Sequence, residues 1–247
     1  MERTENRVKD IYLSIIIPTY NEEKRISATL SRIQFFLRSK TYDYEIIVVD
    51  DGSSDNTVSI IEKDFLTEDG KIRIVKNGSN KGKGFSVKNG ILGSSGKYVL
   101  FSDADLSAPI EEVDRLLKYI NKDYDICIGS RSLKGSNVEI HQPWYREGMG
   151  KVFNFMVKLL LFKDFNDTQC GFKLFKGDIA RKLADLMKID GFCFDVEIIY
   201  LAKRMGYRIV EVGVSWKNSP ESRVKLINSS LDMFRDLFKI KQIHEDI

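Results

Sequence analysis

The sequence predicts an α/β protein built on a mostly parallel sheet that helices cover on both faces. Short and almost continuously apolar segments alternate with segments of helical periodicity between residues 13 and 128. Strands that are apolar at nearly every position are typical of parallel sheets buried on both sides. Polar residues gather directly after three of these strands, where ligands bind in sheets of this class.

The elements follow in order along the chain. Leu13–Pro18 is an expected strand that proline ends, and the apolar residues at 26, 30, 33 and 37 then recur at helical spacing. Ser54 or Asp55 is expected to cap the next helix, which runs through Phe65. The remaining expected strands are 45–50, 72–76, 98–102 and 124–128, and the remaining helices are 84–92 and 110–120. The chain after Ser130 is less regular and is interpreted as an elaboration of one domain, 1–247.

Bulk composition narrows the possible classes of protein. Apolar residues make up 43% and charged residues 30% of the chain, which is typical of a globular protein and excludes disorder. The net charge of +3 gives no support to a nucleic-acid partner. Three cysteines without a closely spaced pair indicate a reduced, cytoplasmic compartment. The charged N-terminus predicts no signal peptide, and no apolar run reaches the length of a membrane-spanning helix.

The sharpest candidate for chemistry is the pair Asp103 and Asp105, separated by Ala104 just after the expected strand 98–102. Two carboxylates at this spacing are able to bind one hard divalent cation, Mg²⁺ or Mn²⁺, which such sites share with substrate phosphates. A turn with a helix cap explains the same residues equally well when they are taken alone.

Two further polar clusters change that balance. Residues 18–22 follow the first strand and residues 49–53 follow the second, and each cluster alone is ordinary turn chemistry. Three such clusters at successive strand ends are hard to explain as turns. Tyr20 offers a ring for stacking on a base, and Asp51 is able to accept a hydrogen bond from its imide or amide group.

At this point the sequence resembles the inverting family 2 glycosyltransferases with the GT-A fold. The motifs are PTYNE at 18–22, VDDGS at 49–53, NKGKG at 80–84, DADLS at 103–107 and GSR at 129–131. They are closest to those of the dolichyl- and polyprenyl-phosphate sugar synthases. The segments DADLSAP and DTQCGFK, the latter at 167–173, resemble the branch that transfers β-glucose to dolichyl phosphate.

The resemblance implies roles for specific residues. Residues about 10–128 would form a nucleotide-sugar-binding half and residues about 129–247 an acceptor-side half. Asp105 would be the main metal ligand, assisted by Asp103, and Ser107 stands where some relatives have a further ligand. The nucleotide-sugar site would comprise Pro18, Tyr20, Glu22, Val49, Asp51, Lys83, Asp103, Ala104 and Asp105. NKGKG is, on its own, better explained as a structural turn.

Basic residues are the candidates for holding an acceptor phosphate, because guanidinium groups bind phosphate oxygens in a fork. They are Arg131, Arg146, Lys217 and Arg223, with UDP-glucose as the expected donor and dolichyl or polyprenyl phosphate as the expected acceptor. Asp167 is a candidate base, although a phosphate acceptor is already a nucleophile at neutral pH and does not require one.

The sequence also contains two amphipathic segments and two histidines. Segment 144–162 is either a core helix or an interfacial helix at a membrane surface, and the stripe 231–238 is a second amphipathic candidate for lipid, a partner helix or self-association. His141 and His244 are interpreted as surface residues. We therefore expect a peripheral enzyme at the cytoplasmic face of a membrane. The alternatives are another donor, a glycan hydroxyl acceptor, or a nucleotide-sugar-binding subunit of a membrane complex.

Overall fold

The computed structural model describes residues 10–66, 70–140, 144–218 and 226–246, with only the backbone described at 144, 146 and 226–231. Its strands are β1 (Leu13–Thr19), β2 (Tyr44–Asp50), β3 (Ile72–Lys76), β4 (Tyr98–Ser102), β5 (Ile126–Ser130), β6 (Asn137–Ile140), β7 (Phe172–Lys176), β8 (Ile209–Gly213) and β9 (Ser215–Lys217). Its helices are α1 (Ile26–Leu37), α2 (Thr57–Asp64), α3 (Lys83–Leu92), α4 (Val113–Ile120), α5 (Trp144–Leu160), α6 (Gly177–Leu186), α7 (Phe194–Arg204) and α8 (Leu226–Ile243), with a 3-10 turn, η1 (Ile110–Glu112), before α4.

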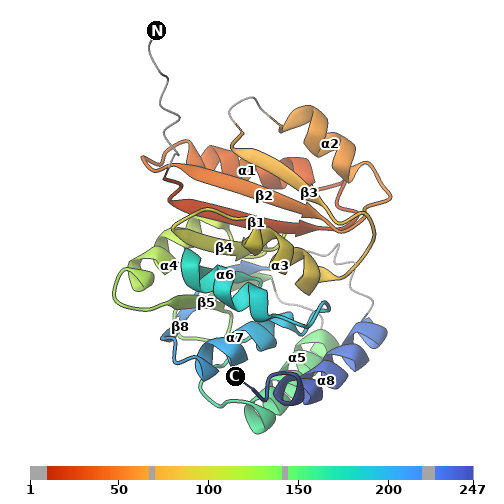
Figure 1. Ribbon diagram of the computed structural model, residues 1–247, viewed down its shortest axis with the longest axis vertical. Helices are drawn as coiled ribbons and strands as arrows, with labels where there is room; N and C mark the ends of the chain where they lie inside the picture. Colours follow the sequence, from red (N-terminus) through yellow and green to blue (C-terminus); the bar gives the residue numbers. More distant parts are fainter. Residues whose placement is uncertain (1–9, 67–69, 141–143, 219–225, 247) are drawn as a thin grey trace.

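A 7-stranded sheet in the order β3-β2-β1-β4-β7-β5-β8 forms the centre of the molecule (Figure 1). Its pairs are parallel except at β7, which runs antiparallel to both β4 and β5. The predicted α/β fold with a mostly parallel sheet is thereby confirmed. β6 and β9 form a separate 2-stranded parallel ribbon.

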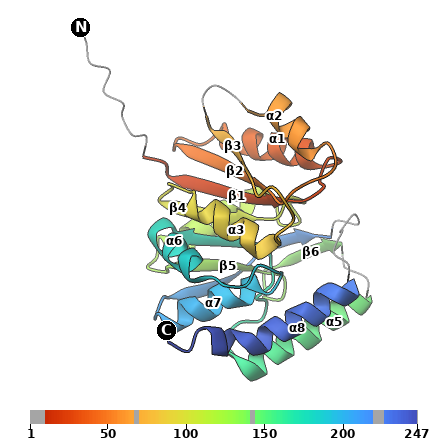
Figure 2. The same ribbon diagram turned by 45° about the vertical axis from the view of Figure 1, so that its right-hand side comes forward.

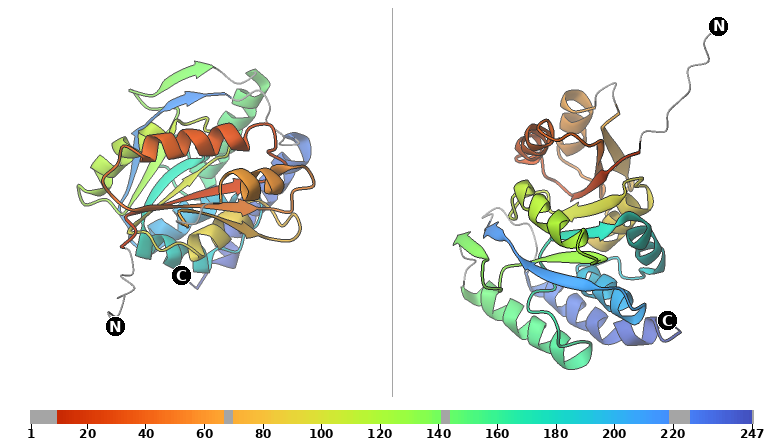
Figure 3. Two further views of the ribbon diagram at one scale, coloured as in Figure 1. Left: turned by 90° about the horizontal axis from the view of Figure 1, so that it is seen from above. Right: turned by 90° about the vertical axis from the view of Figure 1, so that its left-hand side faces the viewer.

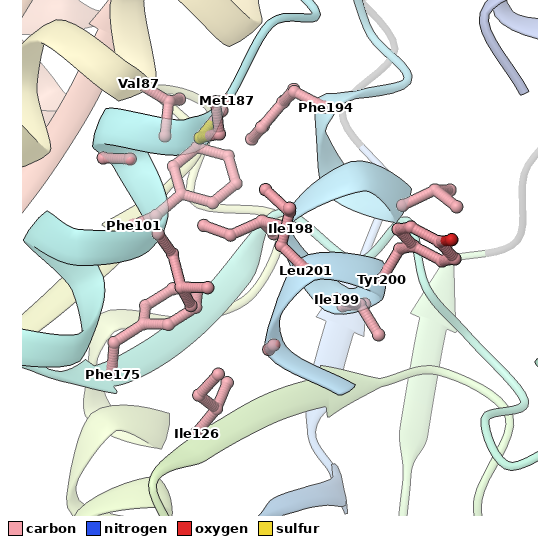
Figure 4. Close-up of a cluster of buried hydrophobic side chains, with 14 of the residues drawn as sticks. Val87, Phe101, Ile126, Phe175, Met187, Phe194, Ile198, Ile199, Tyr200 and Leu201 are labelled. Atoms are coloured by element: carbon pink, nitrogen blue, oxygen red, sulfur yellow. The ribbon is translucent and has the colours of Figure 1, made fainter. Parts of the chain in front are cut away.

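The apolar strands are buried on both faces because successive side chains point to opposite sides of the sheet. Ile15 and Ile17 of β1 belong to the core on the side of α1 and α4, whereas Ile16 between them belongs to the core on the side of α3, α6 and α7. Helices are seen on both sides of the sheet in Figure 3. The second of these cores contains Phe101, Phe175 and Phe194 (Figure 4).

Some boundaries differ from those expected. Strand β5 begins at Ile126, two residues later than predicted, and ends at Ser130. Helix α2 begins at Thr57, and the carboxylate of Asp55 accepts hydrogen bonds from the Thr57 backbone N–H at 3.0 Å and from its hydroxyl at 2.5 Å. Asp55, one of the two predicted caps, thus contacts the first residue of the helix, but the N-cap position itself is Asn56, so the predicted cap was wrong by one residue.

The second half of the chain is more deeply integrated than its irregular pattern suggested. It supplies β7, which lies between β4 and β5 in the centre of the main sheet, as well as the edge strand β8. The charge of Lys173 interrupts the apolar run Phe172–Phe175, so the sequence pattern of β7 does not resemble that of a buried strand. Lys173 is nevertheless only 1% exposed.

Helices α5 and α8 lie side by side at the end of the molecule opposite β3 (Figure 2). The rings of Phe153 on α5 and Phe234 on α8 pack at a centroid distance of 5.5 Å. Within the described residues, none of the helices combines the length and the apolar character that crossing a membrane requires.

His244 corrects one expectation. It was predicted at the surface, but it is 1% exposed, and its Nε2 lies 2.7 Å from Oε1 of the buried Glu197 on α7. An isolated histidine near a chain end gives no periodic signal, so the sequence did not reveal this contact. His141 lies outside the described residues.

Candidate active site

Three polar clusters meet at one edge of the sheet, because β2, β1 and β4 are neighbours and run parallel. The segment after β1 is tied to the segment after β2 by Asn21. Its backbone N–H donates to Ser53 Oγ at 2.9 Å, and its side-chain Oδ1 accepts from the Ser54 N–H at 2.7 Å. Asn21 has a positive φ of 56°, a conformation that asparagine tolerates better than most residues. The predicted convergence of these clusters is therefore present.

Two side chains predicted for the nucleoside pocket lie on this edge. Tyr20 is 43% exposed, so its ring is free of the core. Glu22 is half-buried; its carboxylate pairs with Arg25, and its backbone N–H donates to Thr57 Oγ1 at 2.7 Å. The loop after β1 is consequently fixed to the start of α2.

The carboxylate of Asp51 organises the glycine-rich loop 80–84. Its Oδ1 accepts hydrogen bonds from the Lys81 N–H and from Asn77 Nδ2, and its Oδ2 accepts from the Gly82 N–H, all at 2.9 Å. Asp51 is only 4% exposed. Its buried carboxylate thus positions the loop, a role that the sequence did not suggest.

Close packing explains the glycines of the same loop. A Cβ at Gly82 would lie 2.3 Å from the Asp190 carbonyl oxygen, and Gly82 has a positive φ of 110°. A Cβ at Gly84 would lie 2.3 Å from the Ile189 carbonyl oxygen. The loop is therefore a structural turn clamped against segment 189–191, and it also brings Lys83 into the site.

Replacement of Asp51 by asparagine tests this role. The amide of Asp51→Asn would place an N–H₂ group against a backbone N–H, because the present carboxylate accepts hydrogen bonds on both oxygens. We expect the free energy of unfolding to fall by about 1–3 kcal/mol, the cost of leaving a buried donor unsatisfied. Urea unfolding measures this loss, with the exposed Asp64→Asn as a control that should change stability by less than about 0.5 kcal/mol. An unchanged midpoint in Asp51→Asn would contradict the role.

Asp103 and Asp105 follow β4 and face Lys83. The Lys83 ammonium lies 2.7 Å from Asp103 Oδ1, and the Asp103 backbone N–H donates to the Gly171 carbonyl at 3.1 Å. A Cβ at Gly171 would lie 2.0 Å from Asp103 Oδ2, so the segment before β7 touches this carboxylate directly. Asp105 Oδ1 accepts from the Ser107 N–H at 2.9 Å.

The electrostatics of this pair suit a divalent cation. Burial, followed by the negative charge of Asp103, raises the pKa of Asp105 above its ordinary value. Two neighbouring carboxylates repel each other, and a hard divalent cation that prefers oxygen ligands, such as Mg²⁺ or Mn²⁺, relieves this repulsion. Among the described residues no three acidic, histidine or cysteine side chains form a metal site.

Arg131 and Asp167 form the second part of the site. Arg131 Nε and Nη2 donate to Oδ2 and Oδ1 of Asp167 at 2.7 and 2.8 Å, and the Arg131 backbone N–H donates to Oδ2 at 2.9 Å. Burial alone would raise the pKa of Asp167, but the charge and hydrogen bonds of Arg131 hold it below its ordinary value. The guanidinium also lies 5.5 Å from the ring centroid of Trp216.

The remaining predicted residues are placed as follows. The side chain of Val49 is fully buried against α3, and that of Ala104 is 5% exposed, so neither presents a free side chain to the site. Pro18 is half-buried at the end of β1. Lys217 is exposed on β9, and its backbone N–H donates to the Ser107 carbonyl at 2.8 Å. The side chain of Arg146 and the whole of Arg223 lie outside the described residues.

Four residues that lie at or beside this site have no role predicted from the sequence: Lys173, Asp195, Glu211 and Trp216. Glu211 accepts hydrogen bonds from the backbone N–H groups of Asn166 and Asp167, at 2.9 and 2.8 Å. Only Lys173 could have been recognised from the sequence, because a lysine within an apolar strand is expected either at a sheet edge or in an ion pair. Contacts of the other three depend on segments that are distant in sequence.

Comparison with protein families decides the class of this molecule. The family model described as glycosyl transferase family 2 matches residues 14–184, which include all three strand-end clusters, Arg131 and Asp167. The chain belongs to glycosyl transferase family 2. It is accordingly a glycosyltransferase.

Relatives in this family align along nearly the whole chain. A dolichyl-phosphate beta-glucosyltransferase of Dictyostelium discoideum is 37% identical, over 96% of this chain and 76% of that protein. Proteins of the same name from Saccharomyces cerevisiae and Homo sapiens are 34% and 33% identical, over 96% and 93% of this chain and 76% and 74% of their own lengths.

Solved structures show the same fold at low identity. Glucosyl-3-phosphoglycerate synthase from Mycobacterium tuberculosis, solved with UDP, has a TM-score of 0.70 at 18% identity and covers 93% of this chain and 80% of its own. A mannosyltransferase from Pyrobaculum calidifontis, solved with GDP-Man and Mn²⁺, has a TM-score of 0.58 at 19% identity and covers 88% of this chain and 59% of its own. The fold of this family 2 member is thus the GT-A fold, as predicted.

Proposed function

We propose that this enzyme transfers glucose from UDP-glucose to dolichyl or polyprenyl phosphate with inversion, giving a β-linked lipid-phosphate sugar. The observation that carries the proposal is the placement of Asp103, Asp105 and Lys83 at the sheet edge, across from the Arg131–Asp167 pair. The names of the relatives support glucose and dolichyl phosphate as the substrates.

On the donor side, the chain's own residues would bind and orient the diphosphate. Asp105, with Asp103, would hold Mg²⁺ or Mn²⁺, and the bound ion would neutralise charge that develops on the departing diphosphate. Lys83 is half-buried and cationic, so it is placed to contact the same phosphates. Tyr20, exposed on this edge, would stack on the uracil base.

On the acceptor side, Arg131 would hold the lipid phosphate opposite the donor. A phosphate monoester has a second pKa near 6, so at neutral pH its oxygen is already a nucleophile. Asp167 then has no proton to remove. Its fork contact with Arg131 fixes the guanidinium in the orientation that a phosphate requires.

Asp167→Asn separates this proposal from transfer to a glycan hydroxyl. With a phosphate acceptor we expect turnover to fall by about tenfold, because Arg131 loses its orientation; loss of a required base would cost on the order of 10²–10⁴-fold.

The lowered pKa of Asp167 adds stability to the fold. This stability is present above the ordinary pKa of the carboxyl and is lost as the pH falls through its lower value in the folded protein.

The difference in free energy of unfolding between wild type and Asp167→Asn should therefore be constant above about pH 5 and shrink below about pH 4. Chemical unfolding at a series of pH values measures this difference. A difference that grows as the pH falls would contradict the ionised state of Asp167.

The function itself is tested with purified protein, polyprenyl phosphate, Mn²⁺ or Mg²⁺, and a panel of radiolabelled nucleotide-sugars. We expect label from UDP-glucose in the lipid phase, and none when EDTA replaces the metal. Transfer from GDP-mannose alone would overturn the choice of sugar. Label reaching only a glycan hydroxyl would overturn the acceptor.

We further propose that α5 places the enzyme on the cytoplasmic face of a membrane. Apolar side chains spaced three or four residues apart on α5 are exposed, whereas Phe153 and Val157 face the core. The exposed set is Met149, Val152, Phe155 and Leu159, with exposures of 39%, 57%, 65% and 64%. Such a stripe is expected to enter the interfacial region of a bilayer.

Phe155→Glu is expected to weaken binding to liposomes by at least about tenfold, because burial of one large apolar side chain contributes about 1.5–3 kcal/mol. Flotation with vesicles that contain anionic lipid measures the bound fraction. Phe35→Glu is the matched control, since Phe35 is 79% exposed on α1, and this helix lies at the other end of the molecule from α5 (Figure 1). Equal loss in both variants would argue against a specific face.

A further inference from the structure

A buried ion pair lies beside the donor site and has no part in the function described above. Lys173 of β7 pairs with Asp195 of α7, and the two residues are 1% and 4% exposed. The Lys173 ammonium also donates to the Cys170 carbonyl at 2.7 Å. The neighbours of Lys173 in β7, Phe172 and Leu174, are buried apolar residues.

The pair is linked to Lys83 through the ring of Phe101. The ammonium groups of Lys83 and Lys173 lie 5.3 and 5.9 Å from its centroid, and Lys83 also lies 5.9 Å from the ring of Phe194. Asp195 directly follows Phe194, whose ring packs edge-on against Phe101 at 5.4 Å (Figure 4). The two ammonium groups and one buried carboxylate thus share a single aromatic cluster.

Two carboxylates of different exposure act on Lys83: Asp103 pairs with it at 2.7 Å, and the negative charge of Asp195 acts on it from within the buried pair. Asp103 has a side chain that is 33% exposed, whereas the side chain of Asp195 is 5% exposed. Burial would lower the pKa of Lys83, but Asp103 and then Asp195 raise it, so Lys83 stays charged. Burial raises the pKa of Asp195, and the charges of Lys173 and Lys83 oppose that rise.

Stability alone gives a poor explanation for such a pair. Removing two charges from water costs free energy that their attraction seldom exceeds, and apolar residues of similar size often replace buried pairs without loss. An apolar residue at 173 would also match the rest of β7. A function at the neighbouring site is therefore the better reason for the pair.

We propose that Asp195 is a positioning residue of the donor site, which holds the Lys83 ammonium from the core side while Lys173 balances its charge. This inference rests on the proposed function. Asp103 is the carboxylate that would turn to the metal and diphosphate, and Lys83 would then lose its nearest partner. Asp195 keeps Lys83 in place at that moment, so that its charge is directed at the phosphates.

The test replaces both partners, because each single change leaves a buried charge unpaired and should lower the melting temperature by roughly 10 °C. Lys173→Gln/Asp195→Asn keeps a polar pair without charge, and Lys173→Met/Asp195→Asn is a second version should the first not fold. Asp114→Asn is the control; it removes the carboxylate of the Lys40 pair on the opposite face of the sheet.

Three measurements separate the roles. The melting temperature reports stability, the ¹⁵N signal of the Lys83 ammonium (assigned by its loss in Lys83→Arg) reports position, and calorimetry with UDP and Mn²⁺ reports donor affinity. In the double variant we expect a melting temperature within a few degrees of wild type, a shifted or broadened Lys83 signal and about tenfold weaker UDP binding. The KM for the donor should rise more than kcat falls.

An unchanged Lys83 signal in the folded double variant overturns the proposal, whatever substrate the enzyme uses. A changed signal with unchanged UDP affinity also overturns it, because Asp195 would then hold Lys83 without serving the donor. If the wild type fails to bind UDP, the proposed function fails instead, and the Lys83 signal still decides whether Asp195 positions the lysine.

Discussion

Asp105→Asn is expected to lower sugar transfer by about a thousandfold while the metal-free protein becomes as stable as wild type or more stable. The proposed metal site would lose its main charged ligand, and the ion held there would supply several kcal/mol by neutralising charge on the leaving diphosphate. The gain has the opposite sign because burial and Asp103 raise the pKa of Asp105, so its charged form destabilises the folded protein at neutral pH. The amide retains the Ser107 hydrogen bond, since Oδ1 is the acceptor.

Initial rates with saturating donor and acceptor measure the first effect, and thermal unfolding in EDTA measures the second. Asp114→Asn serves as the control, because Asp114 pairs with Lys40 away from the sheet edge. Added Mn²⁺ should raise the melting temperature of the wild type but not that of Asp105→Asn. Full activity in the variant would remove Asp105 from the proposed metal site.

Arg131→Lys is expected to lower kcat/KM for the lipid phosphate by about a hundredfold, although the charge at this position is unchanged. Lysine cannot reproduce the fork in which Nε and Nη2 contact both oxygens of Asp167, so the cation loses its fixed orientation. The KM for the nucleotide-sugar should change by less than about threefold, since the proposed donor contacts are at Asp103, Asp105 and Lys83.

Steady-state kinetics with each substrate varied in turn separate the two constants. Arg115→Lys is the matched control; this arginine is exposed and donates to the Gly213 carbonyl at 2.7 Å. A larger effect on the KM for the donor than on the KM for the acceptor would contradict the proposal, because Arg131 would then serve the donor. Equal losses in Arg131→Lys and Arg115→Lys would indicate a general effect of arginine replacement.

The first half of the fold was predictable because its signals are local. Strands such as β4 are apolar at nearly every position, and in helix α1 the buried apolar residues between Ile26 and Leu37 recur at helical spacing. Parallel strands then bring their carboxyl ends to one edge, so the meeting of the three polar clusters followed from the strand order alone.

The second half was less predictable because its contacts join distant segments. The charge of Lys173 concealed β7, since its partner Asp195 lies on another element. The hydrogen bonds of the Asp51 carboxylate to the backbone of Lys81 and Gly82 depend on a loop geometry that residue types do not encode. Likewise, no sequence pattern shows that His244 reaches Glu197 across helices.

The central position of β7 has a consequence for how the chain acquires its structure during synthesis. β4 and β5 are complete by Ser130, yet each pairs with β7, which ends at Lys176. Until that segment leaves the ribosome, the edges of β4 and β5 that face β7 are unpaired in the nascent chain, and such edges invite aggregation. Because an interior strand of the sheet arrives late, the sheet is joined across β4 and β5 only after Asp103, Asp105, Arg131 and Asp167 have all been translated.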